Sequence, residues 1–146
     1  MRLKGKVGLV SGAASGIGEA TAKVFAREGA AVVVADLNEA DGHRVVDEIR
    51  NAAGTAEFVR CNIGRPAEVD AAFRFAIEKF GRLDVLHNNA IVFVPGRLGD
   101  ITLEQWQKAI NVGLTSYWYC TKLALDLMVP QGGGAIVNTA SISGVN

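Results

Sequence analysis

Three glycines near the amino terminus have the spacing of an anion-binding turn. Gly12, Gly16 and Gly18 stand between an apolar run, 6–11, and a segment of helical periodicity that begins at Ile17. The first glycine can turn tightly after a strand, the second lets the backbone approach a phosphate at the helix N-terminus, and the third lets the helix pack on the strand. The spacing is G-xxx-G-x-G, a variant of the dinucleotide pattern in the required strand–turn–helix context. An ordinary tight turn is the alternative.

An acid follows at the distance expected for a ribose ligand. Asp36 ends a second apolar run, 30–35. A carboxylate there binds the adenosine ribose hydroxyls, and it repels a 2′-phosphate at ~4 Å by about 4 kcal/mol at an effective dielectric near 20, roughly a thousandfold in affinity. Neither Ser15 nor Leu37 supplies an offsetting cation. We expect NAD rather than NADP, with a plain turn residue or helix cap as the alternative for Asp36.

Short β-branched runs alternate with longer helical patterns along the whole chain. Buried strands that alternate with helices pair in parallel through right-handed crossovers. We therefore expect one doubly wound α/β domain over residues 1–146, without linkers, low-complexity segments or charge runs. The predicted strands are 6–11, 30–35, 56–60, 83–87 and 135–139, and the predicted helices run from 17 to 29, 39 to 52, 66 to 81 and 102 to 128.

These residues, together with later motifs, resemble the classical short-chain dehydrogenase/reductase family, in its N-terminal portion. The segment 11–18 (SGAASGIG) is similar to the family's T-G-xxx-G-I-G turn, with Ser11 in place of threonine. Residues 88–90 (NNA) are similar to its N-N-A-G segment, and Asn111 lies in the long helix as the family's catalytic asparagine does. Residues 136–141 (IVNTAS) resemble the strand that leads into the catalytic serine.

The resemblance implies a Rossmann sheet in the order 3-2-1-4-5, with NAD across the carboxyl ends of the strands. It implies hydride transfer between the nicotinamide and a small-molecule alcohol or ketone, with Ser141 polarising the substrate oxygen and Asn111 ordering a proton-relay water. The pair 62–63 would contact the adenine, and the pair 89–90 the ribose and the central sheet. The implied cofactor-binding residues are Gly12, Ser15, Gly16, Ile17, Gly18, Asp36, Asn62, Ile63, Asn89 and Ala90.

Two positions differ from the family pattern. Asn62-Ile63 stands where the family usually has Asp-Val, so the side chain keeps an acceptor oxygen and gains donors without the charge. Ile91 replaces the glycine of N-N-A-G. A β-branched side chain there either crowds the nicotinamide or shifts the loop, because only glycine allows the closest backbone approach.

The family's general acid/base pair, Tyr-xxx-Lys, is not in the sequence, which ends at Asn146 soon after Ser141. Tyr117, Trp118 and Tyr119 lie earlier, in the long helix, where we expect them to pack in the core or at a subunit interface. We therefore expect an incomplete domain that binds cofactor without turnover. Its fifth strand would be an open sheet edge that promotes association, and the full-length protein would be a homo-oligomer.

The charge balance and the cysteines exclude other function classes. Fifteen Lys and Arg offset fifteen Asp and Glu, so the basic excess of a nucleic-acid binder is missing. No apolar run approaches the ~18 residues of a membrane span, and we expect a cytoplasmic protein without a membrane partner. Cys61 and Cys120 are expected to be buried reduced thiols. His43 and His87 lack the neighbours of a metal site, so none is expected.

Two other functions stay open on the sequence. One is a non-catalytic nucleotide-binding module. The other is a different Rossmann enzyme, such as a methyltransferase, which would leave residues 88–90 and Ser141 without a role. The coding sequence beyond Asn146 separates the dehydrogenase from the non-catalytic module. A Tyr-xxx-Lys there indicates the dehydrogenase, and a stop codon indicates the module. The substrate is not identified, although Phe93 and Leu98 indicate an apolar one.

Overall fold

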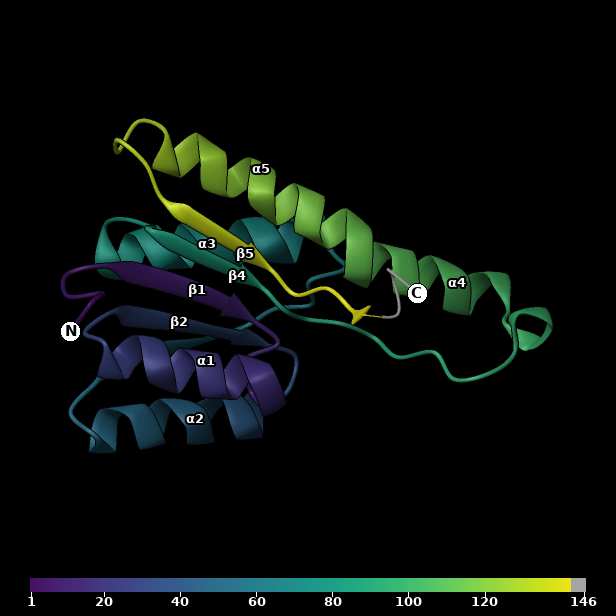
Figure 1. Ribbon diagram of the computed structural model, residues 1–146, viewed down its shortest axis with the longest axis horizontal. Coiled ribbons are helices and arrows are strands. Elements are labelled where there is room, and N and C mark those ends of the chain that lie inside the picture. Colours follow the sequence, from purple (N-terminus) through teal and green to yellow (C-terminus); the bar gives the residue numbers. More distant parts are fainter. Residues whose placement is uncertain (143–146) are drawn as a thin grey trace.

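The computed structural model describes residues 1–142, whose strands form one parallel sheet in the order β3-β2-β1-β4-β5 (Figure 1). The predicted doubly wound fold and the predicted strand order are confirmed. The strands are short and rich in apolar or β-branched residues, and the central strands β1 and β2 are almost fully buried, as strands covered on both faces are. The strands are β1 Val7–Ser11, β2 Ala31–Asp36, β3 Thr55–Arg60, β4 Val85–Asn88 and β5 Ala135–Asn138.

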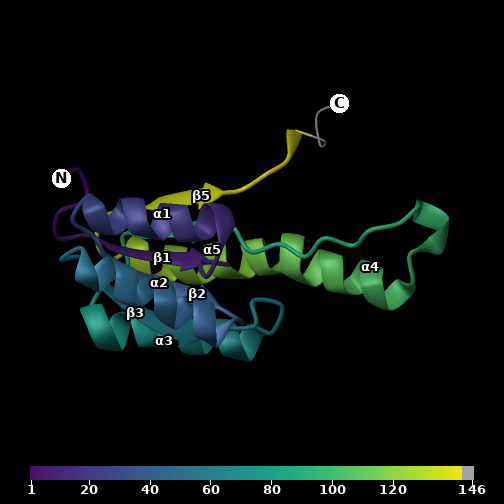
Figure 2. The same cartoon turned by 90° about the horizontal axis from the view of Figure 1, so that it is seen from below.

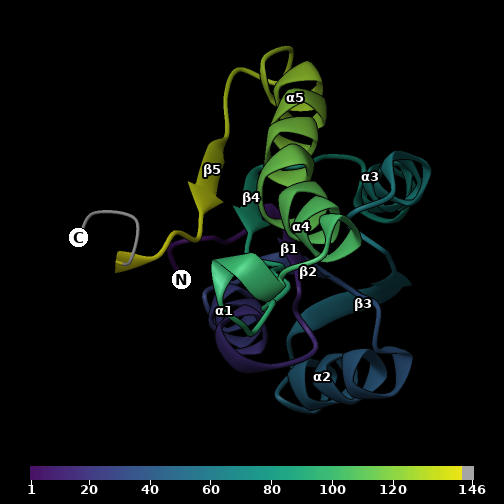
Figure 3. The same cartoon turned by 90° about the vertical axis from the view of Figure 1, so that its right-hand side faces the viewer.

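Helices cover the two faces of the sheet, and each face has its own apolar core. Figure 3 shows α1 and α2 on one side and α3 and α5 on the other. Successive side chains of a strand point to opposite faces, so Val10 packs with α1 and α2 while its neighbour Leu9 packs with α3 and α5. The helices are α1 Gly16–Arg27, α2 Glu39–Asn51, α3 Pro66–Phe80, α4 Leu103–Ile110 and α5 Ser116–Met128.

The sheet order places a crevice at the carboxyl ends of the strands. The chain leaves β1 toward β2 and β3 on one side, and returns to β4 and β5 on the other. In register, Ser11 of β1 lies beside Ala35 of β2, and Val10 lies beside His87 of β4. The glycine turn, the residues after β2 and the residues after β4 therefore meet at this switch point, where open α/β sheets bind ligands.

The single long helix predicted over 102–128 is interrupted. A capping box starts α4, in which the Thr102 hydroxyl accepts from the Gln105 N–H at 3.2 Å and the Gln105 side chain accepts from the Thr102 N–H at 2.9 Å. A π-helical turn, Asn111–Thr115, then separates α4 from α5. Glycine is a poor helix former and serine can bond back to a preceding carbonyl. Both are present, because Gly113 lies in the turn and the Ser116 hydroxyl donates to the Val112 carbonyl at 2.6 Å.

The β5 edge and the outer sides of α4 and α5 expose large apolar side chains. Trp118 on α5 is 63% exposed and Val137 on β5 is 49% exposed, whereas every residue of β1 is buried. The helix α4 contains no buried residue, and with the preceding loop it extends beyond the end of the sheet (Figure 2). Along residues 1–142 no helix is both long and apolar enough to cross a bilayer.

Candidate functional site

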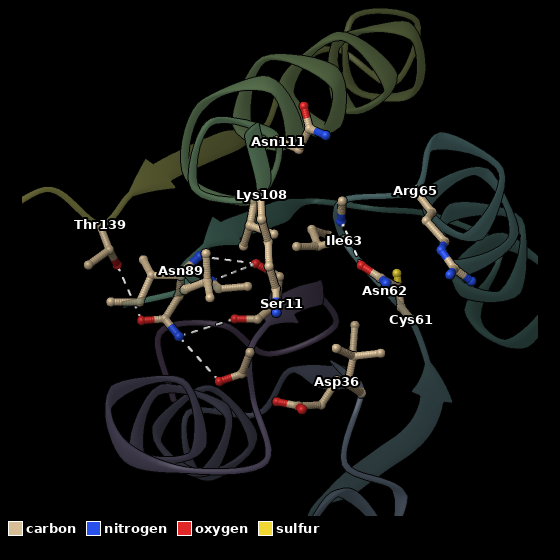
Figure 4. Close-up of a pocket in the computed structure, with 18 of the residues that line it drawn as sticks. Ser11, Asp36, Cys61, Asn62, Ile63, Arg65, Asn89, Lys108, Asn111 and Thr139 are labelled. Carbon is tan, nitrogen blue, oxygen red and sulfur yellow. Dashed lines mark hydrogen bonds between the residues drawn. The ribbon is translucent and has the colours of Figure 1, made fainter. Parts of the chain in front are cut away.

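A cleft of about 1240 Å³ opens at the carboxyl ends of β1, β2 and β4. Figure 4 shows Asp36 and Asn89 on its two sides, with the Lys108 side chain reaching in from α4. Residues from the ends of the strands and from one face of α4 line it. They include Ser11, Gly12, Ser15, Gly16, Ile17, Asp36, Cys61, Asn62, Ile63, Arg65, Asn89, Ala90, Ile91, Val92, Glu104, Gln107, Lys108, Asn111 and Thr139.

The three glycines of the turn each have a distinct structural reason. Gly12 and Gly16 have φ of 65° and 55°, the left-handed region that glycine adopts without strain. A Cβ at Gly12 would lie 2.9 Å from the Cα of Ala90, and a Cβ at Gly18 would collide with the Gly12 carbonyl oxygen. A Cβ at Gly16 would meet nothing within 4 Å. The turn therefore packs tightly on its inner side and leaves the backbone at Gly16 open, as approach by a pyrophosphate requires.

Ser11 and Asn89 join the ends of β1 and β4. The Ser11 hydroxyl accepts from the N–H groups of Asn89 at 3.0 Å and Ala90 at 3.2 Å, and it donates to the His87 carbonyl at 3.4 Å. The Asn89 side-chain amide donates to the carbonyls of Ser11 and Gly12, both at 3.2 Å. Serine thus supplies the hydroxyl that the family's threonine would, and the glycine turn is bonded to the segment after β4.

Asp36 lies at the end of β2, where the sequence predicts the ribose-binding acid. One carboxylate oxygen accepts from the Ala14 N–H at 2.9 Å, and the other accepts from the Asn38 N–H at 3.0 Å. Each oxygen has a further lone pair, and the residue lines the cleft. The carboxylate is thus fixed by two main-chain donors and still able to accept from a ligand hydroxyl.

The pair 62–63, expected to contact the adenine, differs from the expectation in one respect: the acceptor oxygen of Asn62 is used within the protein. The Asn62 side-chain oxygen accepts from the Gly64 N–H at 3.1 Å, and the Asn62 N–H donates to Glu68 at 2.8 Å. The bond to the Asn62 N–H is the main cause that holds the pKa of Glu68 below its usual value. Ile63 is 9% exposed. The oxygen thus helps to shape the loop, and the side-chain NH₂ is the group left to face a ligand.

Asn111 lies where α4 passes into the π-helical turn, toward the Gly64 end of the cleft. Its side-chain oxygen accepts from Gln107 at 2.9 Å, and its carbonyl accepts from the Ser116 N–H. In Figure 4 its amide points away from Asn89 and Thr139. The structure therefore brings Asn111 to the cleft but does not bring its amide to the Thr139 end, where β5 leads toward Ser141.

The segment before Ser141 is tied to the cleft through Thr139. The Thr139 hydroxyl donates to the Asn89 side chain at 3.4 Å and lies 3.0 Å from the Nε2 atom of His87. Burial lowers the pKa of His87, which favours a neutral imidazole. Ser141 itself is exposed, two residues beyond Thr139 and outside the set that lines the cleft.

The two tyrosines of α5 are packing groups, as expected. The Tyr119 hydroxyl donates to Asp70 on α3 at 2.7 Å, and this bond raises the pKa of Tyr119. Burial raises the pKa of Tyr117. Both cysteines are buried free thiols, and burial raises the pKa of Cys61 and of Cys120 to about 12. A thiol with such a pKa is a poor nucleophile.

Asn111 was predicted as a site residue, but the contribution of α4 before it to the cleft was not predicted from the sequence. Glu104, Lys108 and Asn111 are spaced at i, i+4 and i+7, so they share one helix face. That spacing was a usable signal, but it does not say which way the helix faces. Across residues 1–142 there is no group of three or more His, Cys, Asp or Glu residues placed to hold a metal ion.

Known proteins similar in sequence to this chain include dehydrogenases. The model of the short chain dehydrogenase family matches residues 6–146. A 2,5-dichloro-2,5-cyclohexadiene-1,4-diol dehydrogenase of Sphingobium indicum is 42% identical over 144 residues, 99% of this chain and 58% of that protein. A cyclohexanol dehydrogenase of an Acinetobacter species is 39% identical over 145 residues, with coverages of 99% and 58%. The chain thus spans little more than half the length of these relatives.

Solved structures agree with the sheet and its helices. A hydroxysteroid dehydrogenase from Escherichia coli superposes with a TM-score of 0.91 at 37% identity, over 96% of this chain and 57% of the other. A 7α-hydroxysteroid dehydrogenase, solved with NADH and 7-oxo glycochenodeoxycholic acid, superposes with a TM-score of 0.95 at 36% identity, over 99% and 56%. The matched motifs, the strand order and these relatives agree, and the chain belongs to the short chain dehydrogenase family.

Proposed function

We propose that this chain is the cofactor-binding portion of an NAD-dependent dehydrogenase that interconverts a secondary alcohol and its ketone. The observation that carries the proposal is the glycine turn bonded to its neighbours. Gly16 faces open space while Ser11 and Asn89 hold the turn against β4. The pyrophosphate would lie at the N-terminus of α1, where N–H groups and the helix dipole favour an anion.

Asp36 supports NAD over NADP. Two main-chain N–H groups fix its carboxylate beside the cleft. A 2′-phosphate about 4 Å away would be repelled by about 4 kcal/mol at an effective dielectric near 20. Arg44, the basic side chain of α2 that bonds to the Ala14 carbonyl, is already engaged by Glu19 and Glu48. Arg44 is therefore not free to offset the charge of Asp36.

The bound nicotinamide would supply the hydride chemistry, and the chain's own groups would hold and orient the reactants. We assign Ser141 to hydrogen-bond the substrate oxygen and Asn111 to hold a relay water through its side-chain NH₂. In this structure the Asn111 amide points away from Thr139 (Figure 4). General acid/base catalysis needs a proton donor within reach of the substrate oxygen. Since Tyr119 is bonded to Asp70, we propose that residues 1–146 bind cofactor without turnover.

The substrate class follows from the loop after β4 and from the relatives. Ile91 and Val92 line the cleft, and Phe93 and Leu98 are 81% and 82% exposed on the same loop. The relatives named above are dehydrogenases of cyclic alcohols and of steroids. We propose an apolar alicyclic secondary alcohol.

Titration calorimetry with NADH and NADPH tests the cofactor proposal. We expect NADH to bind roughly a thousandfold more tightly to the unmodified protein, because of the Asp36 repulsion. Asp36→Asn should bring the two dissociation constants within about tenfold, since the charge is removed and one hydrogen-bonding side chain stays. Asp126→Asn, an exposed carboxylate on α5, is the matched control and should change neither constant. Equal affinities of the unmodified protein would refute the NAD preference, and no binding of either would refute the cofactor site.

A further inference from the structure

A cluster of charged side chains fastens α2 to α1 beside the cleft. Arg44 donates to Glu19 on α1 at 3.0 Å, to Glu48 at 2.8 Å and to Asp41 at 3.2 Å. Lys23 on α1 bridges Glu19 at 2.5 Å and also contacts Glu48. The guanidinium of Arg44 is therefore held by three carboxylates. The hydrogen bond from Arg44 is the main cause that lowers the pKa of Glu19 to about 2, so Glu19 stays ionised.

Arg44 also reaches the glycine turn itself. Its Nη2 atom donates to the carbonyl of Ala14 at 3.2 Å. Ala14 is 2% exposed, and its N–H donates to the Asp36 carboxylate at 2.9 Å. The N–H of Ala14 thus donates to Asp36, and the carbonyl of Ala14 accepts from Arg44. A main-chain segment held at both groups cannot turn without breaking one of these bonds.

The cluster does not offer Arg44 as a ligand for a 2′-phosphate. Three carboxylates face two cations within it, so its total charge is negative. To reach a phosphate near Asp36, Arg44 would have to leave Glu19, Glu48 and the Ala14 carbonyl together. The five donors of a guanidinium in their fixed fork suit this multiple role, and a lysine ammonium cannot reproduce it.

We propose that Arg44 is a positioning residue for the ribose end of the cleft, which holds the Ala14 carbonyl and thereby fixes the Asp36 carboxylate that selects NAD over NADP. The inference rests on the proposed cofactor function and deepens it. Arg44 acts through Ala14 and Asp36, and it touches neither cofactor nor substrate. Its effect is on the selectivity between the two dinucleotides.

The test compares the dissociation constants of NADH and NADPH for the unmodified protein, Arg44→Met, Arg44→Lys and Arg50→Met. Arg50 is the matched control, because it lies on the same helix, donates to the Ala56 carbonyl at 3.0 Å and pairs with Glu57 at 2.7 Å, away from the turn. Arg44→Lys keeps the positive charge between the helices but lacks the planar set of guanidinium donors. Melting temperatures are measured for all four proteins.

We expect the NADPH/NADH ratio of dissociation constants to fall by about tenfold in Arg44→Met, the size of one lost charge-assisted hydrogen bond at a loosened Asp36. In Arg44→Lys the ratio should fall nearly as far, while the melting temperature stays close to that of the unmodified protein. In Arg50→Met the melting temperature should fall without a change in the ratio. A purely electrostatic role predicts the opposite sign, because removing a cation near the ribose increases repulsion of the 2′-phosphate.

A ratio that rises in Arg44→Met, or one unchanged in both Arg44 variants, overturns the positioning role. If the unmodified protein binds neither dinucleotide, the cofactor proposal fails instead. If it binds both with equal affinity, the Asp36 proposal fails. These results differ from each other, so a failure of the Arg44 inference is distinguishable from a failure of the proposed function.

Discussion

The two halves of the sheet differ in how completely they are covered. On the side of β1, β2 and β3, the helices α1 and α2 pack on one face, and all five residues of β1 are buried. On the side of β4 and β5, the edge strand β5 has no buried residue, and α4 has none either. Trp118 and Val129 are 63% and 69% exposed there. The half of the sheet around β1 and β2, here called the nucleotide side, therefore has a covered core, whereas the β5 side presents apolar surface outward.

The hydrogen bonds between elements differ between the same two halves of the sheet. Polar contacts on the nucleotide side bind several elements into one unit, as Ser11 with Asn89 and Asp36 with Ala14 show. On the other side, the π-helical turn and the loop before α4 carry exposed residues with open space around them, such as Gly113. Substitutions should therefore be costly in the first region and cheap in the second.

The largest effect is expected at the glycine turn. Gly18→Val should destabilise the protein by about 3 kcal/mol, because a side chain at this buried position collides with the Gly12 carbonyl and overpacking cannot relax there. Cofactor affinity should be lost with it. Gly113→Ala is the contrast in the second region, where a Cβ meets nothing within 4 Å, and it should be neutral or stabilise by up to about 1 kcal/mol. Thermal melting measures both, and a tolerated Gly18→Val would break the proposed distinction.

A smaller effect is expected at the amino end of the sheet, where Asp84 joins the two regions. Its carboxylate, 4% exposed, accepts from the Val7 N–H at 3.0 Å and from Arg82 at 2.7 Å. Burial alone would raise the pKa of Asp84, but the bonds from Arg82, Val7 and Lys6 outweigh it and hold the pKa below its usual value. Asp84→Asn should cost about 2 kcal/mol near neutral pH, the size of a charged hydrogen bond.

The pH dependence of that cost has a definite sign. A carboxyl group with a depressed folded-state pKa stabilises the fold above its unfolded pKa, about 3.9, and this stabilisation is lost as pH falls through the folded value. The difference between the unmodified protein and Asp84→Asn should therefore shrink as the pH is lowered below about 4. Denaturant unfolding at a series of pH values checks it. A difference that stays constant down to pH 2 would show that the charge is not responsible.

The smallest effect on stability is expected at the exposed face of α5. Trp118→Ser should change the free energy of unfolding by no more than about 0.5 kcal/mol, as surface substitutions do. It should reduce self-association of the chain, because exposed apolar patches and open sheet edges mediate contacts. Leu37→Ser, 52% exposed on the nucleotide side, is the control and should leave association unchanged. Light scattering at several concentrations measures both, and equal association of all three proteins would refute the difference between the two sides.

Much of the fold and part of the site could be predicted from the sequence. The strands and their parallel pairing were predicted because β-branched runs and helical periodicity are local signals and crossovers are right-handed. The strand order came from the family resemblance. Asp36 was placed at the ribose end because it directly follows a strand. The interruption at Asn111–Thr115 was not predicted, since a single glycine and a serine in a helical pattern are also compatible with a continuous helix.

The sequence by itself determined the positions that demand a particular backbone. Gly12 and Gly16 adopt a conformation that other residues disfavour, and β1 is apolar because both its faces are covered. Only the tertiary structure decided which distant groups meet. The bond from Arg44 to Ala14, the use of the Asn62 oxygen by Gly64 and the direction of the Asn111 amide depend on helix rotation and strand register. Hydrogen bonds form only within about 3.5 Å, and a spacing along the chain does not specify distances that small between separate elements.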